Sequence, residues 1–314
     1  MASPQFETDF DPAHGQAVKV AVDIVRVTAN NHGPLTFHGT NSYIIDGGNA
    51  LAVLDPGPAD DDAHYQALLK AIDGRAVSHI VITHTHMDHS PLAARLKADT
   101  GAAIVGCAKH HAARPLYIGE QNPLDGAVDH HYEPDQVLVH GASVKIGRHL
   151  LTAIATPGHT ANHLAYGLGN TGIAFSGDHV MAWATSIVAP PDGAMSDYMA
   201  SLDTMIARND RLLLPGHGGP VTNPEAFMRG LKAHRKLRER AIVERIQKGD
   251  RKIADIVAVI YRSVDKRLHG AAGLSVLAHL EDLVARSIIA TDGVVRIDGD
   301  YWPTTPISAA SISA

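Results

Sequence analysis

Residues 78–91 read SHIVITHTHMDHSP, an apolar β-branched run followed by four side chains that can ligate a metal ion: His84, His86, Asp88 and His89. The run predicts a buried strand, and along an extended backbone His84 and His86 point to the same side. Ser90 and Pro91 then predict a helix start with the Ser90 hydroxyl as its cap. The alternative is that these histidines, in a chain with 21 of them, are solvated or hydrogen-bonded in a core. The spacing and the strand context favour metal ligation.

Three later loops each follow an expected strand and carry one more metal-type ligand. They place His159 after residues 150–155, Asp178 after residues 172–175 and His217 after residues 211–214. Binding residues of layered α/β folds collect in loops that follow strand ends. Neighbouring glycines let the backbone approach closely in each loop. We therefore predict that these three residues share one site with the 84–89 cluster.

These residues together make seven protein ligands, more than the three that a catalytic zinc takes beside its water. We expect two divalent ions, with zinc as the metal and iron or manganese as alternatives. One ion takes His84, His86 and His159, the other takes Asp88, His89 and His217, and Asp178 offers one oxygen to each. Two ions roughly 3.5–4 Å apart hold a bridging hydroxide, the expected nucleophile for hydrolysis of an ester, amide or phosphate. Asp88 is in addition the candidate proton shuttle.

Strands and helices alternate around these loops, which predicts α/β layering. The expected strands of the first part cover residues 18–27, 41–45, 50–54 and 102–107, and the expected helices cover residues 60–72 and 90–100. Residues 115–133 form a longer connection than usual, a feature typical of functional or mobile loops. Asp55, after one of these strands, is a candidate to hydrogen-bond a ligand histidine, although an Asp-Pro-Gly turn also explains it.

The composition is that of a globular protein, with 45% hydrophobic and 19% charged residues among 314. Its single cysteine, Cys107, excludes an intramolecular disulfide and thiol-pair chemistry. The first ten residues lack the basic and apolar segments of a signal peptide, and no stretch has membrane-spanning length. We therefore predict a cytoplasmic protein without membrane contact. Residues 1–16 are expected to be a flexible lead-in, residues 17–224 one domain and residues 225–314 another.

The last part of the chain differs in charge from the rest. Residues 1–224 carry a net charge of −10 and residues 225–314 a net charge of +4. Helices are expected over residues 222–247, 252–261 and 273–286, followed by a hairpin over 287–297 that turns at Asp292-Gly293 and is closed by residues 301–303. Helices followed by a hairpin match a winged-helix plan. The basic residues of the first of these helices either meet an anionic partner or form a solvated face.

The run His84-Thr85-His86-Met87-Asp88-His89, with His159, Asp178 and His217 following in that order, resembles the metallo-β-lactamase superfamily over residues 18–220. The resemblance implies a four-layer αββα sandwich with the metals at the edge between two sheets. Residues 39–43, residues 54–57 and the tail resemble the subgroup called β-lactamase-like protein two, with a glyoxalase II-type metal site and a small C-terminal winged-helix domain. Some members of that subgroup are single-strand RNA endonucleases, and fungal relatives are thioesterases acting on carrier-bound polyketides.

The expected function is therefore that of a metal-dependent hydrolase that cleaves an ester, thioester or phosphodiester. The resemblance implies a small-molecule or carrier-bound acyl substrate, or single-stranded RNA, and in the subgroup the winged helix helps to shape the substrate channel. The alternative role for that domain is a structural lid or a dimer surface, so a homodimer stays open. The substrate-binding candidates are Thr40 and Asn41, on resemblance, and His179, which lies beside a ligand loop.

Three other functions remain as alternatives. A nucleic-acid-binding regulator would use the first domain as a structural or sensing metal domain and the basic tail as its DNA contact. A β-lactamase or a mono-iron persulfide dioxygenase are minor alternatives that the superfamily resemblance brings with it.

Overall fold

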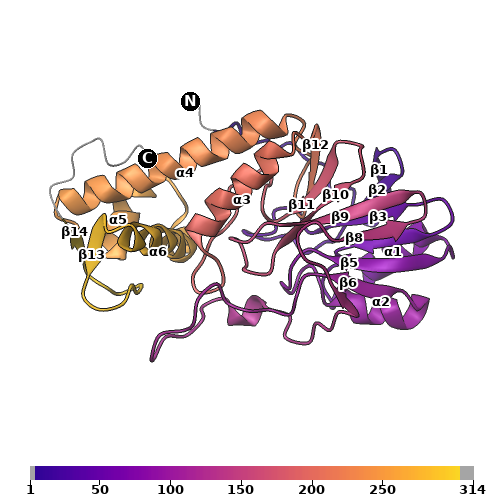
Figure 1. Ribbon diagram of the computed structural model, residues 1–314, viewed down its shortest axis with the longest axis horizontal. Coiled ribbons are helices and arrows are strands. Elements are labelled where there is room, and N and C mark those ends of the chain that lie inside the picture. The colour runs from indigo at the N-terminus through magenta and orange to yellow at the C-terminus, as the bar shows by residue number, and fades with distance from the viewer. Residues whose placement is uncertain (1–3, 305–314) are drawn as a thin grey trace.

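The first domain consists of two β-sheets packed face to face in the computed structural model, which describes residues 4–304 (Figure 1). The larger sheet has seven strands in sequence order: β1 (Val18–Ala21), β2 (Ile24–Thr28), β3 (Asn41–Asp46), β4 (Leu51–Leu54), β5 (Val77–Ile82), β6 (Ala103–Gly106) and β7 (Gln136–Val137). The smaller sheet runs β12-β11-β10-β9-β8 and contains β8 (Ser143–Ile146), β9 (His149–Ala155), β10 (Leu164–Leu168), β11 (Ile173–Gly177) and β12 (Leu212–Pro215).

Helices cover both outer faces of this sandwich. α1 (Asp62–Ile72) and α2 (Leu92–Thr100) bury Leu68 and Leu96 in the core that also joins the two sheets. α3 (Met195–Ala207) and the first turns of α4 (Pro224–Gln247) pack in a second core behind the smaller sheet, where Leu202 and Leu231 are fully buried. The expected αββα layering is therefore confirmed.

Parallel strand pairs bring the ligand loops to one edge of the sandwich. β4, β5 and β6 are parallel, and α1 and α2 make the crossovers that parallel neighbours require. β11 and β12 are parallel as well, with α3 between them. The carboxyl ends of these strands meet at the same edge and deliver Asp55, His84, Asp178 and His217 there.

Hydrogen bonds tie the two sheets together at this edge. The Asn41 amide donates to the Gly216 carbonyl at 2.7 Å, and the Tyr43 hydroxyl donates to the Pro215 carbonyl at 2.8 Å. The Tyr166 hydroxyl, fully buried, donates to the Ile82 carbonyl at 2.7 Å. Buried hydrogen bonds of this kind leave little freedom for relative movement of the loops that follow.

Two local expectations are wrong. The strand expected over residues 18–27 is divided into β1 and β2, because the chain turns at Asp23, whose φ is 62°. The Ser90 hydroxyl does not cap α2; it donates to the buried Asp129 carboxylate at 2.7 Å, and a hydrogen bond to a charged acceptor is the stronger one.

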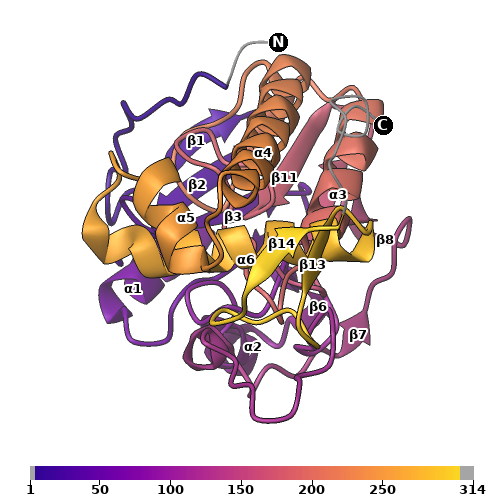
Figure 2. The ribbon, with the colours of Figure 1, turned by 90° about the vertical axis from the view of Figure 1, so that its left-hand side faces the viewer.

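The tail forms a second domain with its own core. It comprises the second half of α4, α5 (Ile253–Ile260), α6 (His269–Ala285) and the strand pair β13 (Ile289–Thr291) and β14 (Tyr301–Pro303) (Figure 2). The expected helices and the winged-helix plan are confirmed. The hairpin differs, because β13 pairs with residues 301–303 and Asp292-Gly293 lies in a longer connection.

Helix α4 is continuous between the two domains. Met228 and Leu231 belong to the second core, whereas Ile242 and Ile246 belong to the core of the tail. The long loop that precedes β7 adds a further link, because Arg114 pairs with Glu120 of that loop and with Glu281 of α6. The two domains are therefore joined by one helix and by an ion-pair network.

The N-terminal segment lies against the first domain from residue 4 onward. The Glu7 amide donates to the Ala182 carbonyl at 2.9 Å, and the Arg26 guanidinium donates to the Asp11 carbonyl at 2.8 Å. Residues 1–3 and 305–314, parts of the expected lead-in and tail, lie outside the described residues, and the domain limits stay a prediction. Within residues 4–304 no helix is long and apolar enough to cross a membrane.

The core of the tail gives a first test. Leu280 is fully buried there, so Leu280→Ala should lower the free energy of unfolding by about 2–5 kcal/mol through lost burial and a cavity. The same substitution at Leu237, which is 49% exposed on α4, should change it by about 0.5 kcal/mol or less. Urea unfolding followed by circular dichroism measures both, and equal effects of the two substitutions would contradict this core.

Candidate metal centre

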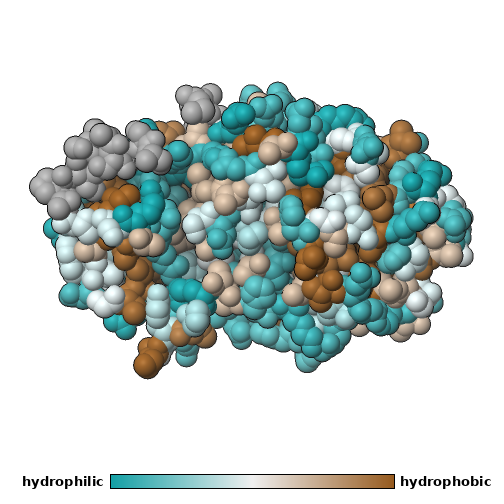
Figure 3. Space-filling model, viewed as in Figure 1, coloured by the Kyte–Doolittle hydropathy of each residue, from teal (hydrophilic) through white to brown (hydrophobic). Residues whose placement is uncertain are grey.

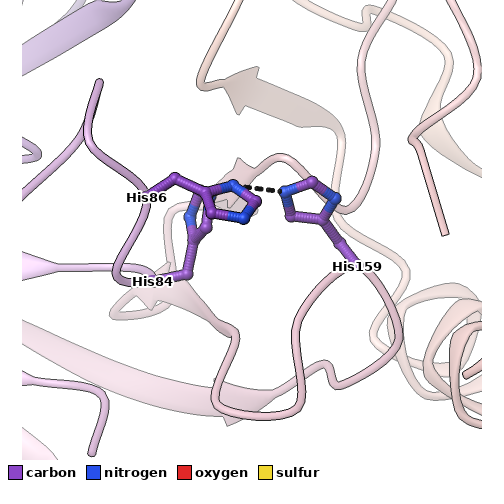
Figure 4. A group of neighbouring side chains, drawn as sticks. All are labelled: His84, His86 and His159. Atoms are coloured by element: carbon purple, nitrogen blue, oxygen red, sulfur yellow. Dashed lines mark hydrogen bonds between the residues drawn. The ribbon is translucent and has the colours of Figure 1, made fainter. Parts of the chain in front are cut away.

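Three histidines converge from two loops at the edge of the sandwich (Figure 4). His86 Nδ1 lies 3.0 Å from His84 Nε2 and 3.0 Å from His159 Nε2. Tetrahedral ligands at 2.0–2.1 Å from a zinc ion are about 3.3 Å apart, so these three nitrogens are spaced as ligands of one ion.

A second group of three lies beside the first. His89 Nε2 is 3.3 Å from His217 Nε2, and Asp88 Oδ2 is 3.3 Å from the former and 3.2 Å from the latter. These separations also match the spacing that a tetrahedral ion imposes on its ligands.

Asp178 lies between the two groups. Its Oδ2 is 3.7 Å from His159 Nε2 and 3.3 Å from His217 Nε2, and its Oδ1 is 3.5 Å from His89 Nε2. One carboxylate thus faces a nitrogen of each group. The structure brings all seven predicted ligands together, in the two sets expected from the sequence.

The three histidines of the first group have lowered pKa values, so they are uncharged and could bind a cation. Burial lowers the pKa of His84 well below its ordinary value and lowers that of His86 to about 3. Burial lowers the pKa of His159 as well. Three neutral imidazoles therefore direct nitrogens at one point, where a divalent cation would use all three lone pairs. The donor set fits a metal ion.

The second group carries protons where the first does not. Burial disfavours the charged form of His217, yet the carboxylates of Asp178 and Asp88 raise its pKa to about 10. Burial acts in the same direction on His89, but Asp88 and Asp178 hold its pKa well above the ordinary value. The two carboxylates are therefore neutralised by two imidazolium groups that a metal ion would replace.

The outer ring nitrogens of four of these histidines have partners that orient the rings. His89 Nδ1 lies 3.0 Å from Asp55 Oδ2, which confirms the hydrogen bond expected of Asp55. The other partners, listed by ring, are Thr83 Oγ1 for His84 at 3.0 Å, the Ile187 carbonyl for His159 at 2.8 Å and the Gly39 carbonyl for His217 at 3.1 Å. Such partners set the tautomer and the direction of a metal-ligating imidazole.

Asp55 itself is held by the neighbouring strand end. Its carboxylate accepts from the Thr83 amide at 2.8 Å and from the Thr83 hydroxyl at 2.7 Å. The β4 and β5 loops are thereby fixed to each other directly beneath the two groups. Thr83 was not among the residues singled out from the sequence, and its only signal is its position between the strand and His84.

A glycine is required where the β12 loop passes the site. A Cβ on Gly216 would lie 2.4 Å from Asp178 Oδ1 and 2.7 Å from His89 Cε1. Both separations are too short for real atoms, so any side chain here would displace a predicted ligand. Close approach of backbone to the site explains the glycine that precedes His217.

The three substrate-binding candidates, Thr40, Asn41 and His179, are buried, and none of them lines the cavity described below, so their contact with substrate stays a prediction. The Thr40 hydroxyl lies 3.0 Å from Asp88 Oδ2, and the Asn41 side chain donates to the carbonyls of Pro215 and Gly218. His179 packs against Tyr198 behind the site. Thr40 and Asn41 thus support ligand loops. His163, beside His179, accepts from the Asp178 amide at 3.1 Å.

A cavity of about 630 Å³ opens directly onto both ligand groups. Five predicted ligands lie in its wall, and most of the remaining wall is apolar: Phe6, Pro34, Leu35, Met87, Leu124, Ala127, Met181, Trp183, Ala184, Ile187, Val264 and Leu268. Trp183 is held by stacking on Phe37, with ring centroids 4.7 Å apart. Leu124 and Ala127 come from the long loop over residues 115–133, whose length is typical of functional or mobile loops.

The tail contributes one side of this cavity. The individual residues of the tail that line it were not predicted from the sequence. His234 and Arg238 of α4 line it, together with Tyr261, Val264 and Leu268. His234 and Arg238 are four positions apart and therefore lie on one face of α4. That spacing was the available signal, but it was not distinguishable within the basic stripe of residues 229–252, which contains ten basic residues: Arg229, Lys232, Arg235, Lys236, Arg238, Arg240, Arg245, Lys248, Arg251 and Lys252.

Comparison with known proteins agrees with this fold. Residues 35–217 match the model of the metallo-beta-lactamase superfamily, and residues 253–302 match that of the beta-lactamase associated winged helix domain. A beta-lactamase-like protein 2 homolog of Caenorhabditis elegans is 30% identical over 230 residues, which cover 72% of this chain and 72% of that protein. An atrochrysone carboxyl ACP thioesterase of Cryptosporiopsis sp. (strain 8999) is 30% identical over 234 residues, covering 73% of this chain and 64% of that protein.

Solved structures show the same arrangement over both domains. A beta-lactamase domain protein from Burkholderia ambifaria superposes with a TM-score of 0.76 at 21% identity, covering 94% of this chain and 95% of that one. A metallo-beta-lactamase family protein from Thermus thermophilus gives a TM-score of 0.73 at 20% identity, covering 91% of this chain and 100% of that one. At these identities the likeness concerns the fold alone.

The glycine beside the ligands gives a test of the site. Gly216→Ala should lower zinc affinity by about 10- to 100-fold, because the added methyl group displaces the Asp178 carboxylate or the His89 ring. Gly270→Ala is the matched control, since a Cβ there meets nothing within 4 Å. Competition with a chromophoric chelator measures the affinities. Unchanged zinc affinity in Gly216→Ala would place the ion elsewhere.

The pKa pattern predicts that the two groups take up ions with different pH dependence. Binding to the second group must release the protons of His89 and His217, whereas binding to the first group releases none near neutral pH. Affinity for one of the two ions should therefore rise as pH increases toward about 10, the pKa of His217. Affinity for the other ion should change little between about pH 6 and pH 8.5.

Calorimetric titration of metal-free protein with zinc, in buffers of different ionisation enthalpy, counts the protons released by each equivalent. One equivalent should release about two protons and the other close to none. Equal proton release for both equivalents would contradict the charge distribution between the groups.

Proposed function

The chain belongs to the metallo-beta-lactamase superfamily of metal-dependent hydrolases, and we propose that it cleaves the ester or thioester bond of an apolar acyl group with two divalent ions at its centre. The observation that carries this proposal is the cavity: two ligand groups open into about 630 Å³ of mainly apolar space. An acyl chain buried there gains roughly 0.8 kcal/mol per methylene group. Walls of this kind bind a hydrocarbon chain and keep competing water out.

When bound, two divalent ions lower the pKa of a water molecule and polarise the carbonyl of the substrate. His84, His86 and His159 would hold one ion, Asp88, His89 and His217 the other, and Asp178 would contact both. In Asp88 the Oδ2 atom faces His217 and the Thr40 hydroxyl. The Oδ1 atom, for which no hydrogen bond or ion pair is present among residues 4–304, is the proposed proton acceptor at the cavity.

The relatives support an acyl substrate. The Cryptosporiopsis protein is named an atrochrysone carboxyl ACP thioesterase. In the present chain, Trp183 lines the cavity, and its buried Nε1 has no hydrogen-bond partner among the described residues.

The basic stripe of residues 229–252 gives little support to nucleic-acid binding. Five of its ten charges are paired within the described chain: Arg229 pairs with Glu225, Lys232 with Asp203, Arg245 with Asp250, Lys248 with Glu244 and Lys252 with Asp300. Arg235 is buried and donates to the Ser186 carbonyl. A nucleic-acid surface needs cations free to meet phosphates.

The exposed surface fits the same proposal. On the face drawn in Figure 3, hydrophobic residues are interspersed among hydrophilic ones, without a broad apolar area. An apolar surface that could enclose an acyl chain is therefore found in the cavity and not on that face.

Turnover on a series of acyl-pantetheine thioesters tests the proposal. Protein loaded with zinc should hydrolyse them with a kcat/KM that increases with acyl length, and His84→Ala should reduce it by about 100-fold or more through loss of an ion. His131→Ala, an exposed histidine of the long loop, is the matched control and should retain full turnover. Cleavage of single-stranded RNA by loaded protein that leaves every thioester intact would overturn the acyl assignment.

A further inference from the structure

One positive charge stands in the cavity wall without a counter-charge. Arg238 is the only arginine or lysine among the described residues that line the cavity. Its Nη1 donates to the Ile260 carbonyl at 3.2 Å, and its guanidinium lies 4.3 Å from the centre of the Tyr261 ring. Among residues 4–304 no carboxylate lies within ion-pair distance of it. Other arginines of α4, such as Arg229 and Arg245, have such partners.

The Arg238 guanidinium has N–H donors that make no hydrogen bond among the described residues. Arg238 carries five N–H groups in a planar fork, and one of them accounts for the bond to Ile260. The ring of Tyr261 fixes the plane of the guanidinium without using its edge. The remaining N–H groups stand in a wall that is otherwise mainly apolar, where an unpaired charge is costly.

His234 adds a second polar group one helical turn away. It lines the same cavity, and its Nδ1 is buried without a hydrogen-bond partner among the described residues. Burial, together with the charges of Arg235 and Arg238, lowers the pKa of His234 to about 4, so the ring is neutral and retains one N–H to donate.

Two further basic side chains lie near this pair, of which Arg235 carries a positive charge and His279 is neutral. Arg235, one residue from His234, is buried with its Nε unpartnered, and His279 of α6 is buried with both ring nitrogens unpartnered. Burial and the nearby charges of Arg235 and Arg238 hold the pKa of His279 well below its ordinary value. Of these basic groups, Arg238 and His234 line the cavity, and a guanidinium with unused donors and no carboxylate within ion-pair distance is suited to an anion.

We propose that Arg238, with His234, binds an anionic group of the substrate, a carboxylate or a phosphate, while the bond to be hydrolysed lies at the metal centre. The inference rests on the proposed function and narrows it. The substrate is then an ester or thioester that bears an anionic group remote from its scissile carbonyl. A planar guanidinium matches both anions with two parallel hydrogen bonds.

The chemical step is unchanged by this contact. Water oxygen bonds to the carbonyl carbon, the bond from that carbon to sulfur or oxygen breaks, and the leaving thiol or alcohol takes a proton, which gives an acid and a thiol or alcohol. Arg238 exchanges neither proton nor electrons. It is a specificity-determining residue, and its contribution is expected in binding rather than in the rate of bond cleavage.

The anionic group could lie on the acyl side or on the thiol side of the substrate. Thioether analogues that carry the charge on one side or the other distinguish these two possibilities, and they remain intact during the measurement because they are not hydrolysed. S-hexyl-pantetheine is the neutral reference, S-(5-carboxypentyl)-pantetheine carries a carboxylate on the acyl side, and S-hexyl-4′-phosphopantetheine carries a phosphate on the thiol side. Calorimetric titration of zinc-loaded protein with each analogue measures Kd directly. Because the readout is binding, it stays informative even if no thioester is turned over, so failure of the proposed function is recognised separately.

Wild-type protein should bind one of the charged analogues with a Kd at least about 10-fold lower than that of the neutral analogue. The charged analogue with the lower Kd shows on which side of the substrate the anionic group lies. Arg238→Gln should remove this difference, and Arg238→Lys should keep part of it. Arg240→Gln removes the same charge from an exposed position of the same helix and should keep all of it.

Equal affinities of the three analogues for wild-type protein would overturn the proposal. So would an Arg238→Gln protein that still prefers the charged analogue, because Arg238 would then serve only to pack on Tyr261 and to hold the end of α5. Thermal unfolding of each variant identifies one that does not fold. If Arg238→Gln does not fold, Arg238→Lys, which keeps the charge but not the planar fork, decides the question: a reduced preference for the charged analogue supports the proposal, and an unchanged preference overturns it.

Discussion

The structure depends on a group of imidazoles and carboxylates packed at hydrogen-bond distances where two sheets meet. Three of the imidazoles are neutral, and two are balanced by the carboxylates of Asp88 and Asp178. Such a group is costly to bury unless the backbone holds every member in place and a cation or protons balance it. Much of the first domain can be understood as the means of holding it, because strand ends, buried tyrosine hydroxyls and the Asp55 carboxylate all converge beneath it.

The positions of these residues follow from where strands end. β4, β5, β11 and β12 stop at one edge, and each delivers a side chain that contacts the group. The hydrogen bonds of Asn41 to Pro215 and Gly218 link the start of β3 in the larger sheet to the loop after β12 that carries His217. Thr40 and Asn41, expected at the rim for contact with substrate, thus lie under it and hold the His217 loop in register. In this fold, the buried polar residues near the site are explained more directly by their hydrogen bonds to the ligand-bearing loops than by contact with a substrate.

This distinction also shows what the sequence could and could not predict. The ligand set was predictable, because each member follows an apolar strand pattern and because Gly216 and its neighbours mark a close backbone approach. The layering and the tail helices were predictable from periodicity. The division of the first strand at Asp23 and the pairing of β13 with β14 were not, because they depend on a residue with positive φ and on register between distant segments. The wall of the cavity was least predictable, since it is assembled from residues 6, 34–36, 124–127, 181–187 and 234–268.

Helix α4 connects the predictable part of the site with the unpredictable part. Its first turns are packed against α3 behind the smaller sheet, and its later turns form the core of the tail, so His234 and Arg238 lie on a rigid element anchored at both ends. A helix of 24 residues is about 36 Å long, which is enough to span both cores without a joint. The distance between the metal centre and the guanidinium is therefore set by packing rather than by a flexible loop. Within one superfamily fold, changing the residues on this face of α4 and on the neighbouring α5 would alter which substrates fit, while the ligand loops and their chemistry remain as they are.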